Sequence, residues 1–548
     1  MTDLDGRPIA ETATAVIRNP VLPGFHPDPS ILRVGADYYI ATSTFEWYPG
    51  VRVHHSTDLV SWRPLGGVLT ERRLLDLTGT ADSCGVWAPS LTYADGLFHL
   101  VYTDVATFAG GYWDPQNYLV TAPSMAGPWS DPVVLHGRGF DASLFHDEDG
   151  TTWMLSMRAD WRPGRNRFAG ISAQRYDRRH RRLTGPEHVI FEGTDAGLTE
   201  APNIYHKDGW YYLVTAEGGT TWTHQVTVAR SRQLLGDYQV DPAGPLLTSA
   251  GRPDLALQKA GHGSLVQTPA GEWYLAHLVG RPYAPSDRCV LGRETALQQV
   301  DWPTGAWPRI RDSVPAEQVA APSGTAVTSG PPAPQTDKDH FEGTTLSADW
   351  STLRRPAAPD WVDLAARPSH LRIHGGQSPM ARHRPSLVAR RVTARRCTFE
   401  ATCESEPRSF RQLAGITAYY NSRNWYYLHM TADDDGGVVL DVLACDSGRV
   451  TTVQDVRVPL GAVRRVGLRA RLDGPALTFA WTTEPGSGWH EVGRTFDATT
   501  LSDEYAATAA PGEPEAWGFT GAFVGLWVQD LGAEGGYADF DQATYRTD

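Results

Sequence analysis

The hydrophobic and polar positions of the first 280 residues follow one small pattern that occurs five times. Each copy has a short apolar strand, a turn rich in Gly and Asp, and a second strand rich in aromatic and branched residues, which predicts a β-hairpin. Because a hairpin cannot bury its own apolar face, a regular array of hairpins indicates like units stacked around an axis. Five such units predict a five-bladed β-propeller. The copies begin about 53 to 61 residues apart, at Asp28, Ala88, Asp141, Ala201 and His262.

Three acids, Asp28, Asp141 and Glu200, lie at or beside the start of a repeat. In a propeller the first strand of each blade lines the central channel, so corresponding positions of different blades meet at one place. A single Asp before a strand more often only caps a turn. Three acids in register are harder to explain in this way, because an unpaired buried carboxylate is costly. The pattern therefore indicates one shared functional site.

The length of 548 residues exceeds what one core normally supports, so we expect more than one domain. The repeats predict a propeller over residues 19–310. Residues 311–338 are rich in Pro, Ala, Gly, Ser and Thr and predict a linker on the surface. Residues 339–548 alternate apolar and polar positions without the repeat, which predicts a β-sandwich. We expect three aromatic residues near its end to belong to its core, with contact to the propeller as the alternative: Trp517, Phe519 and Phe523.

Composition and charge exclude several classes of function. A net charge of −14 argues against nucleic acid or an anionic membrane surface as a partner. The five cysteines have neither metal-ligand spacing nor the pattern of a disulfide framework. The N-terminal residues lack the apolar segment of a secretory signal, and no apolar stretch is long enough to span a membrane, so we expect a cytoplasmic location. Phosphate-binding, dinucleotide-binding, zinc-protease and nucleophile-elbow motifs are absent from the sequence.

Three carboxylates around one channel mouth suit the acid–base cleavage of a glycosidic bond, which needs no cofactor. One acid protonates the leaving oxygen while a second carboxylate handles the nucleophile. The charge of a third carboxylate keeps a neighbouring acid protonated. Trp87, Phe140 and Arg293 are candidate sugar contacts, although core packing or a structural ion pair would also explain them. His262 opens the fifth repeat and either contacts substrate, water or a cation in the channel, or is a structural histidine.

Many segments of the chain, in order, resemble glycoside hydrolase family 43, and specifically its two-domain β-xylosidases. They include HPDPSI, STFEWYPGV, GVWAPSL, GFDASLFHDEDG, LTEAPNIY, GHGSLVQT and LGRETALQ, with FTGAFVGL and YADFD near the C-terminus. The resemblance implies an all-β chain with a five-bladed propeller followed by a concanavalin A-like, jelly-roll sandwich. It also implies an inverting exo-hydrolase that releases xylose from the non-reducing end of short β-1,4-xylooligosaccharides.

The same resemblance implies a role for each candidate residue. Asp28 matches the general base, Asp141 the carboxylate that tunes the acid and orients the substrate, and Glu200 the general acid. His262 matches a histidine that neighbours a divalent cation, often calcium, in some members. The remaining matches are substrate contacts, of which the last closes the site from the sandwich: Phe45, Trp87, Phe140, Arg293 and Phe519.

Several alternatives stay open at this point. Members of the family also remove α-L-arabinofuranosyl groups, and the sequence separates the two activities poorly. A shortened loop at GRPYAPSDRCVLGRET leaves the leaving-group preference undecided. Relatives form dimers or tetramers, so a homodimer or homotetramer is expected only by analogy. A sugar-binding propeller without activity, or a scaffold propeller, would need no set of three acids.

Overall fold

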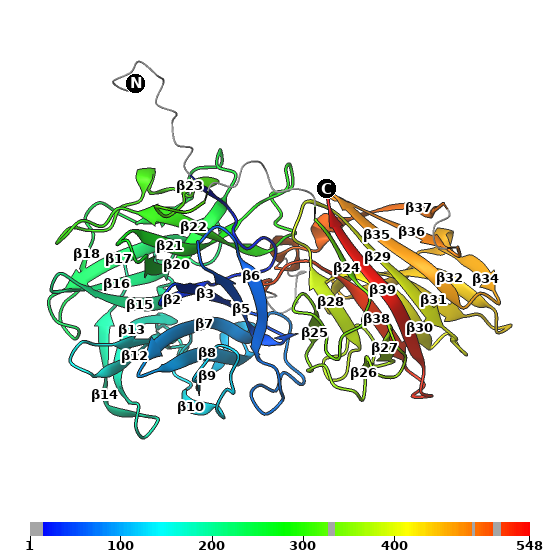
Figure 1. Ribbon diagram of the computed structural model, residues 1–548, viewed down its shortest axis with the longest axis horizontal. Coiled ribbons are helices and arrows are strands. Elements are labelled where there is room, and N and C mark those ends of the chain that lie inside the picture. The colour runs from blue at the N-terminus through cyan, green and yellow to red at the C-terminus, as the bar shows by residue number, and fades with distance from the viewer. Residues whose placement is uncertain (1–14, 327–334, 485–487, 508–516) are drawn as a thin grey trace, which may run out of the picture.

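The computed structural model describes residues 15–326, 335–484, 488–507 and 517–548, which form two all-β domains side by side (Figure 1). The structure confirms the expected fold, a five-bladed propeller followed by a concanavalin A-like sandwich. Residues 1–14, on which part of the expectation about a signal segment rests, lie outside the described ranges. Within those ranges, the helices are all too short or too polar to cross a membrane.

Five antiparallel sheets form the propeller, and their first strands pack against one another in a closed ring. The first blade contains β2 (Ser30–Val34), β3 (Asp37–Thr42), β5 (Gly50–Ser56) and β6 (Arg63–Leu69). The second contains β7 (Gly85–Ala94), β8 (Leu97–Thr107), β9 (Asp114–Ala122) and β10 (Val133–His136). The third contains β11 (Ser143–His146), β12 (Thr152–Ala159), β13 (Phe168–Asp177) and β14 (Arg182–Phe191). The fourth contains β15 (Glu200–Lys207), β16 (Trp210–Glu217), β17 (Gln225–Ser231), β18 (Gln239–Val240) and β19 (Leu247–Thr248); the fifth contains β20 (Gln258–Gln267), β21 (Trp273–Gly280) and β22 (Arg293–Val300).

Polar side chains on the innermost strands join neighbouring blades. The third residue of every repeat is Ser or Asn. The hydroxyl of Ser30 accepts a hydrogen bond from the backbone N–H of Leu91 in the second blade (2.9 Å). That of Ser264 accepts one from Ile31, which joins the fifth blade to the first (3.2 Å). These bonds satisfy buried backbone groups between the sheets, so the repeated Ser helps to fix the ring that carries the acids.

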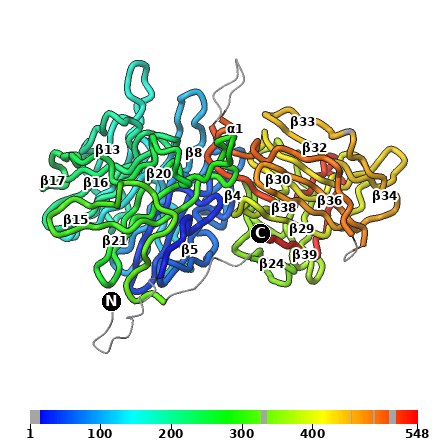
Figure 2. The backbone as a smooth tube through the Cα atoms, turned by 90° about the horizontal axis from the view of Figure 1, so that it is seen from above, coloured from blue at the N-terminus to red at the C-terminus, as the bar shows by residue number. Residues whose placement is uncertain are grey.

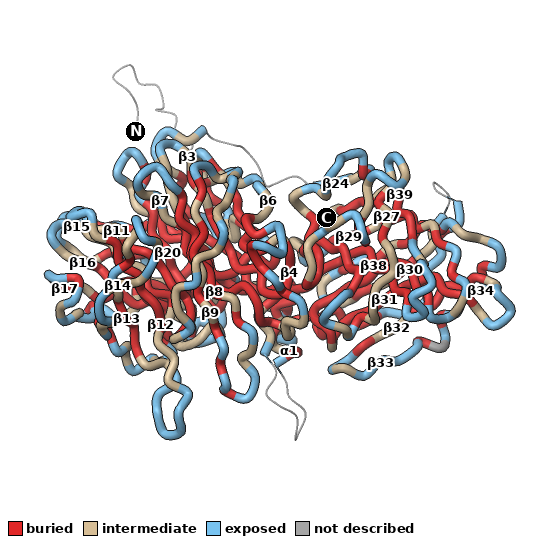
Figure 3. Tube along the Cα trace, turned by 90° about the horizontal axis from the view of Figure 1, so that it is seen from below, coloured by how far each residue is buried: buried red, intermediate tan, exposed pale blue. Residues whose placement is uncertain are grey.

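The sandwich consists of two large antiparallel sheets with a continuous apolar core between them (Figure 3). One sheet contains β24 (Thr336–Asp339), β26 (Val362–Asp363), β27 (Leu371–His374), β29 (Arg396–Ser405), β35 (Arg465–Asp473), β36 (Ala476–Thr482), β37 (His490–Asp497) and β39 (Tyr537–Thr547). The other contains β4 (Trp47–Tyr48), β25 (Ser351–Leu353), β28 (Leu387–Arg391), β30 (Gln412–Asn421), β31 (Asn424–Ala432), β32 (Val438–Asp446), β33 (Arg449–Thr452), β34 (Val458–Gly461) and β38 (Phe523–Asp530). The short helix α1 (Asp503–Ala506) precedes β38.

The two domains share a sheet and a core at their junction (Figure 2). Strand β4 belongs to the propeller sequence but pairs with β25 at the edge of a sandwich sheet. The indole ring of Trp47 stacks on Phe523, with ring centroids 3.9 Å apart and planes 14° apart. Both side chains are fully buried. The expectation that Phe523 is a core residue is therefore correct, but that core also contains side chains of the propeller.

The predicted linker contains short strands at both ends. Strand β23 (Gln318–Ala320) pairs with β1 (Val16–Arg18) beside the fifth blade, and β24 pairs with β39 of the sandwich. Residues 327–334 of the predicted linker lie outside the described residues. The side chain of Asn19 bonds to both the N–H and the C=O of Leu297 in β22, so the segment after β1 is fixed to the last blade.

Candidate active site

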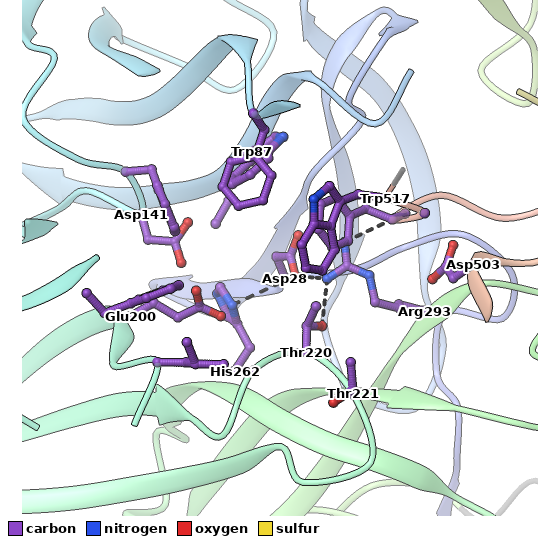
Figure 4. A pocket seen from close by; sticks show the side chains of 18 of the residues that line it. Asp28, Trp87, Asp141, Glu200, Thr220, Thr221, His262, Arg293, Asp503 and Trp517 are labelled. Carbon is purple, nitrogen blue, oxygen red and sulfur yellow. Dashed lines mark hydrogen bonds and ion pairs between the residues drawn. The ribbon is translucent and has the colours of Figure 1, made fainter. Parts of the chain in front are cut away.

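Asp28, Asp141 and Glu200 line one pocket, as the repeat pattern predicts (Figure 4). The pocket has a volume of about 660 Å³ and lies where the innermost strands of the propeller begin. In Figure 4 the three carboxylates point into the same space, with Trp87 on one side and His262 on the other. Residues of the sandwich, including Trp517 and Phe519, line the same pocket. The site therefore requires both domains.

The backbone at the start of the repeats is strained in a way that directs side chains toward the axis. Asp28, Asp141, Ala201 and His262 have φ angles of 56°, 54°, 52° and 47°. Left-handed φ is uncommon for residues other than Gly and costs about 1–3 kcal/mol where the fold enforces it. The strand pairing is also irregular at Glu200, which is where a bulge redirects a side chain. Because strain of this kind concentrates at functional sites, the geometry agrees with the position of the acids.

Asp28 is buried but surrounded by groups that favour its ionised form. One carboxylate oxygen accepts a hydrogen bond from Arg293 Nη1 (2.9 Å), and the other accepts one from the hydroxyl of Ser43 (2.7 Å). His262 Nδ1 lies 3.8 Å from the first oxygen. Burial alone would raise the pKa of Asp28, but the charge of Arg293, with His262 and Ser43, outweighs it and lowers the pKa. Asp28 is therefore the carboxylate most easily kept ionised.

The other two acids are shifted in the opposite direction. Burial, followed by the charge of Asp28, raises the pKa of Asp141 well above its ordinary value. Burial, followed by the charges of Asp141 and Asp28, raises the pKa of Glu200 in the same way. The pocket thus holds one carboxylate that favours the ionised form beside two that favour the protonated form. A pair of acids with separated pKa values is the arrangement that acid–base chemistry at one pH requires.

Arg293 connects the acid group to the sandwich domain. Besides Asp28, its Nη1 donates to the hydroxyl of Thr220 (3.0 Å), and its Nη2 donates to the backbone carbonyl of Phe519 (3.0 Å). The guanidinium carbon lies 5.5 Å from the ring centroid of Phe45 and 5.4 Å from that of Phe519. Arg293 is therefore both an ion-pair partner of Asp28 and a wall of the pocket, which unites the two interpretations that the sequence left open.

The predicted aromatic contacts form one continuous wall. The rings of Trp87 and Phe140 meet edge to face at 5.0 Å, and those of Phe45 and Phe519 stack at 6.0 Å. Trp517 stacks on Phe519 at 5.9 Å and is 37% exposed. Trp517 and Phe519 line the pocket and contact the propeller, which is the alternative to packing within the sandwich alone. Phe519 also packs against the core that the two domains share. The substrate contact that the resemblance implies for Phe519 stays a prediction. Aromatic faces of this kind are suited to the apolar faces of sugar rings.

The surroundings of His262 do not match a direct calcium site. Calcium takes six to eight oxygen ligands, whereas the described residues contain no group of three or more His, Cys, Asp or Glu side chains placed to hold a metal ion. The nearest carboxylate to His262 is already paired with Arg293, and a guanidinium group disfavours a cation beside it. His262 lines the pocket, and burial lowers its pKa.

Several residues of the pocket carry no signal in the sequence that would have identified them. Glu504 of α1 forms an ion pair with Lys259 of the fifth blade, and its neighbour Asp503 accepts a hydrogen bond from Tyr420 (2.6 Å). Burial, and then the charge of Glu504, raises the pKa of Asp503 to about 6. These acids belong to a single turn of helix far from the repeats, so only the fold brings them to the pocket. Thr220 had a weak signal in the sequence, because it directly follows two glycines in the blade that carries Glu200, and such a turn is a common place for a residue that contacts a ligand.

Comparison with known proteins identifies the family. A model described as glycosyl hydrolases family 43 matches residues 17–308, and one described as beta xylosidase C-terminal concanavalin A-like domain matches residues 338–546. A beta-xylosidase of Bacillus subtilis (strain 168) is 41% identical over 546 residues, which cover 97% of this chain and 99% of that protein. A xylosidase/arabinosidase 43B of Humicola insolens is 42% identical over 537 residues, 97% of each chain.

The fold agrees with a solved structure over its whole length. The crystal structure of a xylan beta-1,4-xylosidase from Bacillus halodurans C-125 has a TM-score of 0.92 and 46% sequence identity, and the match covers 97% of this chain and 100% of that one. The match includes both domains and therefore the pocket between them. The chain belongs to glycosyl hydrolase family 43 and is a glycoside hydrolase.

Proposed function

We propose that the protein is an inverting exo-β-xylosidase that releases xylose from the non-reducing end of short β-1,4-xylooligosaccharides. The observation that carries this proposal is the convergence of Asp28, Asp141 and Glu200 in one pocket, where Asp28 alone is ion-paired with Arg293. The pKa directions, downward for Asp28 and upward for Glu200, agree with it. The sandwich lines one side of this pocket, which favours entry of a chain end over the middle of a polymer. The named activities of the similar proteins support the choice of xylose.

Each acid has a distinct part in the proposed reaction. Glu200, held protonated, donates its proton to the glycosidic oxygen as the bond to the anomeric carbon breaks. Asp28, held ionised by Arg293, accepts a proton from the water that attacks the opposite face of the sugar. Burial and the charge of Asp28 already favour the protonated form of Glu200, and once Asp141 loses its own proton its charge raises the pKa of Glu200 further, so Glu200 keeps its proton to higher pH. The sugar then leaves with inverted configuration and both acids return to their first state through solvent.

A second activity, removal of α-L-arabinofuranosyl groups, is favoured by one observation. The Humicola insolens relative, at 42% identity, has a name that joins xylosidase and arabinosidase. The same three acids would serve both reactions, because the chemistry at the anomeric carbon is the same. We therefore propose arabinofuranosidase as a side activity.

The test compares substrates and follows the first product. Purified protein should release xylose from xylobiose and an aryl β-xyloside, and more slowly release arabinose from an aryl α-L-arabinofuranoside. Proton NMR recorded before mutarotation should detect α-xylose first. Initial β-xylose would mean retention and would remove Asp28 as a base that activates water. Higher kcat/KM on the arabinofuranoside would reverse the order of the two activities.

The location, the oligomeric state and the need for calcium are also proposed. The five buried cysteines form no disulfide, which is usual in a reducing compartment and supports a cytoplasmic location. A homodimer or homotetramer is proposed by analogy, and light scattering on a sizing column measures it. Calcium has no part in the proposed reaction, because glycoside hydrolysis by two carboxylates needs no cofactor.

A further inference from the structure

A group of four basic side chains is buried at the junction of the domains. Arg52 and His54 project from the same face of β5, because side chains alternate along a strand. Arg391 ends β28 on the sandwich side, and His26 lies two residues before Asp28. Figure 1 shows β5 and β28 on the two sides of the junction. All four residues are buried, at 3–6% exposure.

The four side chains converge closely. Arg52 Nη1 and Arg391 Nη1 both donate to the hydroxyl of Ser351, at 3.2 and 3.1 Å. The two guanidinium groups are therefore neighbours despite their like charge. The imidazole rings of His26 and His54 meet edge to face with centroids 4.7 Å apart. The charges of both arginines act on both histidines.

This group lacks a negative partner among the residues that the structure describes. Neither Arg52 nor Arg391 forms an ion pair there, and their hydrogen bonds go to Ser351 and to backbone carbonyls. Asp349 favours both charges from a distance, without a hydrogen bond to either. Arg391 Nη2 and the Nδ1 atoms of both histidines are buried without a hydrogen-bond partner. Unpaired buried charges and unsatisfied buried donors are both costly.

The protonation states favour an anion over a further cation. Burial, together with the guanidinium charges, holds the pKa values of His26 and His54 well below the ordinary value, so both rings are neutral near pH 7. A neutral imidazole still offers one N–H. Burial lowers the pKa of Arg52 to about 10, and burial followed by the charge of Arg52 holds the pKa of Arg391 well below its ordinary value. Because guanidinium groups keep their protons in proteins, the group has positive charge without a partner and spare N–H donors, and an anion would relieve both.

We propose that Arg52, Arg391, His26 and His54 form a binding site for a small monovalent anion of the halide class, such as chloride. One anion between the guanidinium groups would reduce their repulsion and accept the hydrogen bonds that Arg391 Nη2 and the imidazoles leave unmade. The near-complete burial of the four side chains favours a monatomic ion over phosphate or sulfate. Because the ligands come from both domains, the anion would stabilise the junction. This site is separate from the acids of the pocket.

Bromide identifies such a site directly, because it replaces chloride and scatters anomalously. Crystals of the full chain grown with sodium bromide should give an anomalous peak bonded to Arg52, Arg391 and the two histidines. Bromide peaks found only at other places in the molecule would show an adventitious ion only and would overturn the proposal. So would a map without any bromide peak at the junction.

A solution measurement tests the same site with matched variants. Sodium bromide or chloride should raise the melting temperature of the wild type in a saturable way, by about 2–5 °C above sodium acetate at equal ionic strength. Arg391→Gln should lose this halide-specific rise. Arg390→Gln is the control, because Arg390 is next in sequence but is paired with Asp337 (2.6 Å), and it should keep the rise. An equal response in Arg391→Gln and wild type would refute the proposal.

If Arg391→Gln does not fold, as judged by near-UV circular dichroism, Arg52→Gln replaces it. Arg52 makes only weak hydrogen bonds, at 3.2 and 3.4 Å, so its removal disturbs less structure. The same loss of the halide-specific rise is expected. A rise that persists in Arg52→Gln would contradict a site that depends on both guanidinium groups.

Discussion

The guanidinium group of Arg293 donates a hydrogen bond to the backbone carbonyl of Phe519, at 3.0 Å, across the junction of the two domains. The same group holds Asp28 through its other nitrogen. The closing segment of the sandwich is thus bonded directly to the residue that fixes the charge of the proposed base. The acids of the propeller form a complete pocket only when the sandwich is in place.

Phe519→Ala tests what the aromatic ring adds, because the substitution keeps the backbone carbonyl that Arg293 binds. The ring stacks on Phe45 and forms part of the pocket wall, so we expect kcat/KM on xylobiose to fall about 10- to 100-fold, a loss of roughly 1–3 kcal/mol of binding. Phe410→Ala, which removes a ring that is 64% exposed on the sandwich, is the control. Steady-state kinetics measure both, and equal activity of the two variants would exclude Phe519 from the pocket wall.

Glu200→Gln removes the proposed proton donor while keeping the shape of the side chain. On xylobiose we expect kcat to fall about 10²–10⁴-fold, the usual contribution of a general acid. On an aryl xyloside with a good leaving group the loss should be much smaller, since that group needs little protonation. Glu192→Gln, at an exposed position eight residues earlier, should leave both rates unchanged. A loss of the same size on both substrates would rule against Glu200 as the acid.

Asp28→Asn separates the base from the acid. Activation of water is required whatever group leaves, so xylobiose and the aryl xyloside should lose activity together, by at least about 10²-fold. Asp37→Asn in the same blade, where the carboxylate only contacts His55 near the surface, is the matched control. Steady-state kcat values of both variants on xylobiose and on the aryl xyloside measure these losses. Retention of most activity in Asp28→Asn would remove Asp28 from the reaction.

The dependence of kcat/KM on pH should be bell-shaped, and its two sides have different origins. Activity falls at low pH as Asp28, whose pKa is lowered, becomes protonated; it falls at high pH as Glu200, whose pKa is raised, loses its proton. Asp141→Asn removes one of the charges that raise the pKa of Glu200. We therefore expect the basic side of the profile to move to lower pH, by about one unit or more.

The acidic side of the profile serves as the internal control for Asp141→Asn. It reports Asp28, whose pKa depends first on burial and then on Arg293, so it should move much less. The profile is measured on the aryl xyloside in buffers of constant ionic strength. A basic side that stays in place, or moves to higher pH, would contradict the role proposed for Asp141.

How much of this site the sequence could predict depends on how each residue reaches the pocket. Asp28, Asp141 and Glu200 belong to a repeat, so symmetry alone brings them together once the propeller is inferred. Asp503 and Trp517 approach from a second domain, and the pattern of one domain holds no information about how another docks. The five-bladed fold followed from hairpin periodicity, which reports burial.

The junction shows the same limit for packing. Alternation of apolar residues predicted that Phe523 is buried, and it is. The pattern could not reveal that its partner is Trp47 of the propeller, because a buried residue has the same sequence signature whichever domain covers it. The pairing of β4 with β25 is hidden for a related reason, since strands of two and three residues leave no periodicity to detect.

Trp47→Ala tests whether this shared core joins the domains into one unit. The indole is fully buried and stacks on Phe523 at 3.9 Å, so its removal should lower the free energy of unfolding by about 3–5 kcal/mol. Trp161→Ala, at a site that is 47% exposed, should cost less than about 1 kcal/mol. Urea titrations followed by circular dichroism measure both. If the domains depend on one another through this contact, Trp47→Ala should lose activity together with its circular dichroism signal, and at a lower urea concentration than the wild type. Equal midpoints for Trp47→Ala and Trp161→Ala would mean that each domain is stable without the shared core.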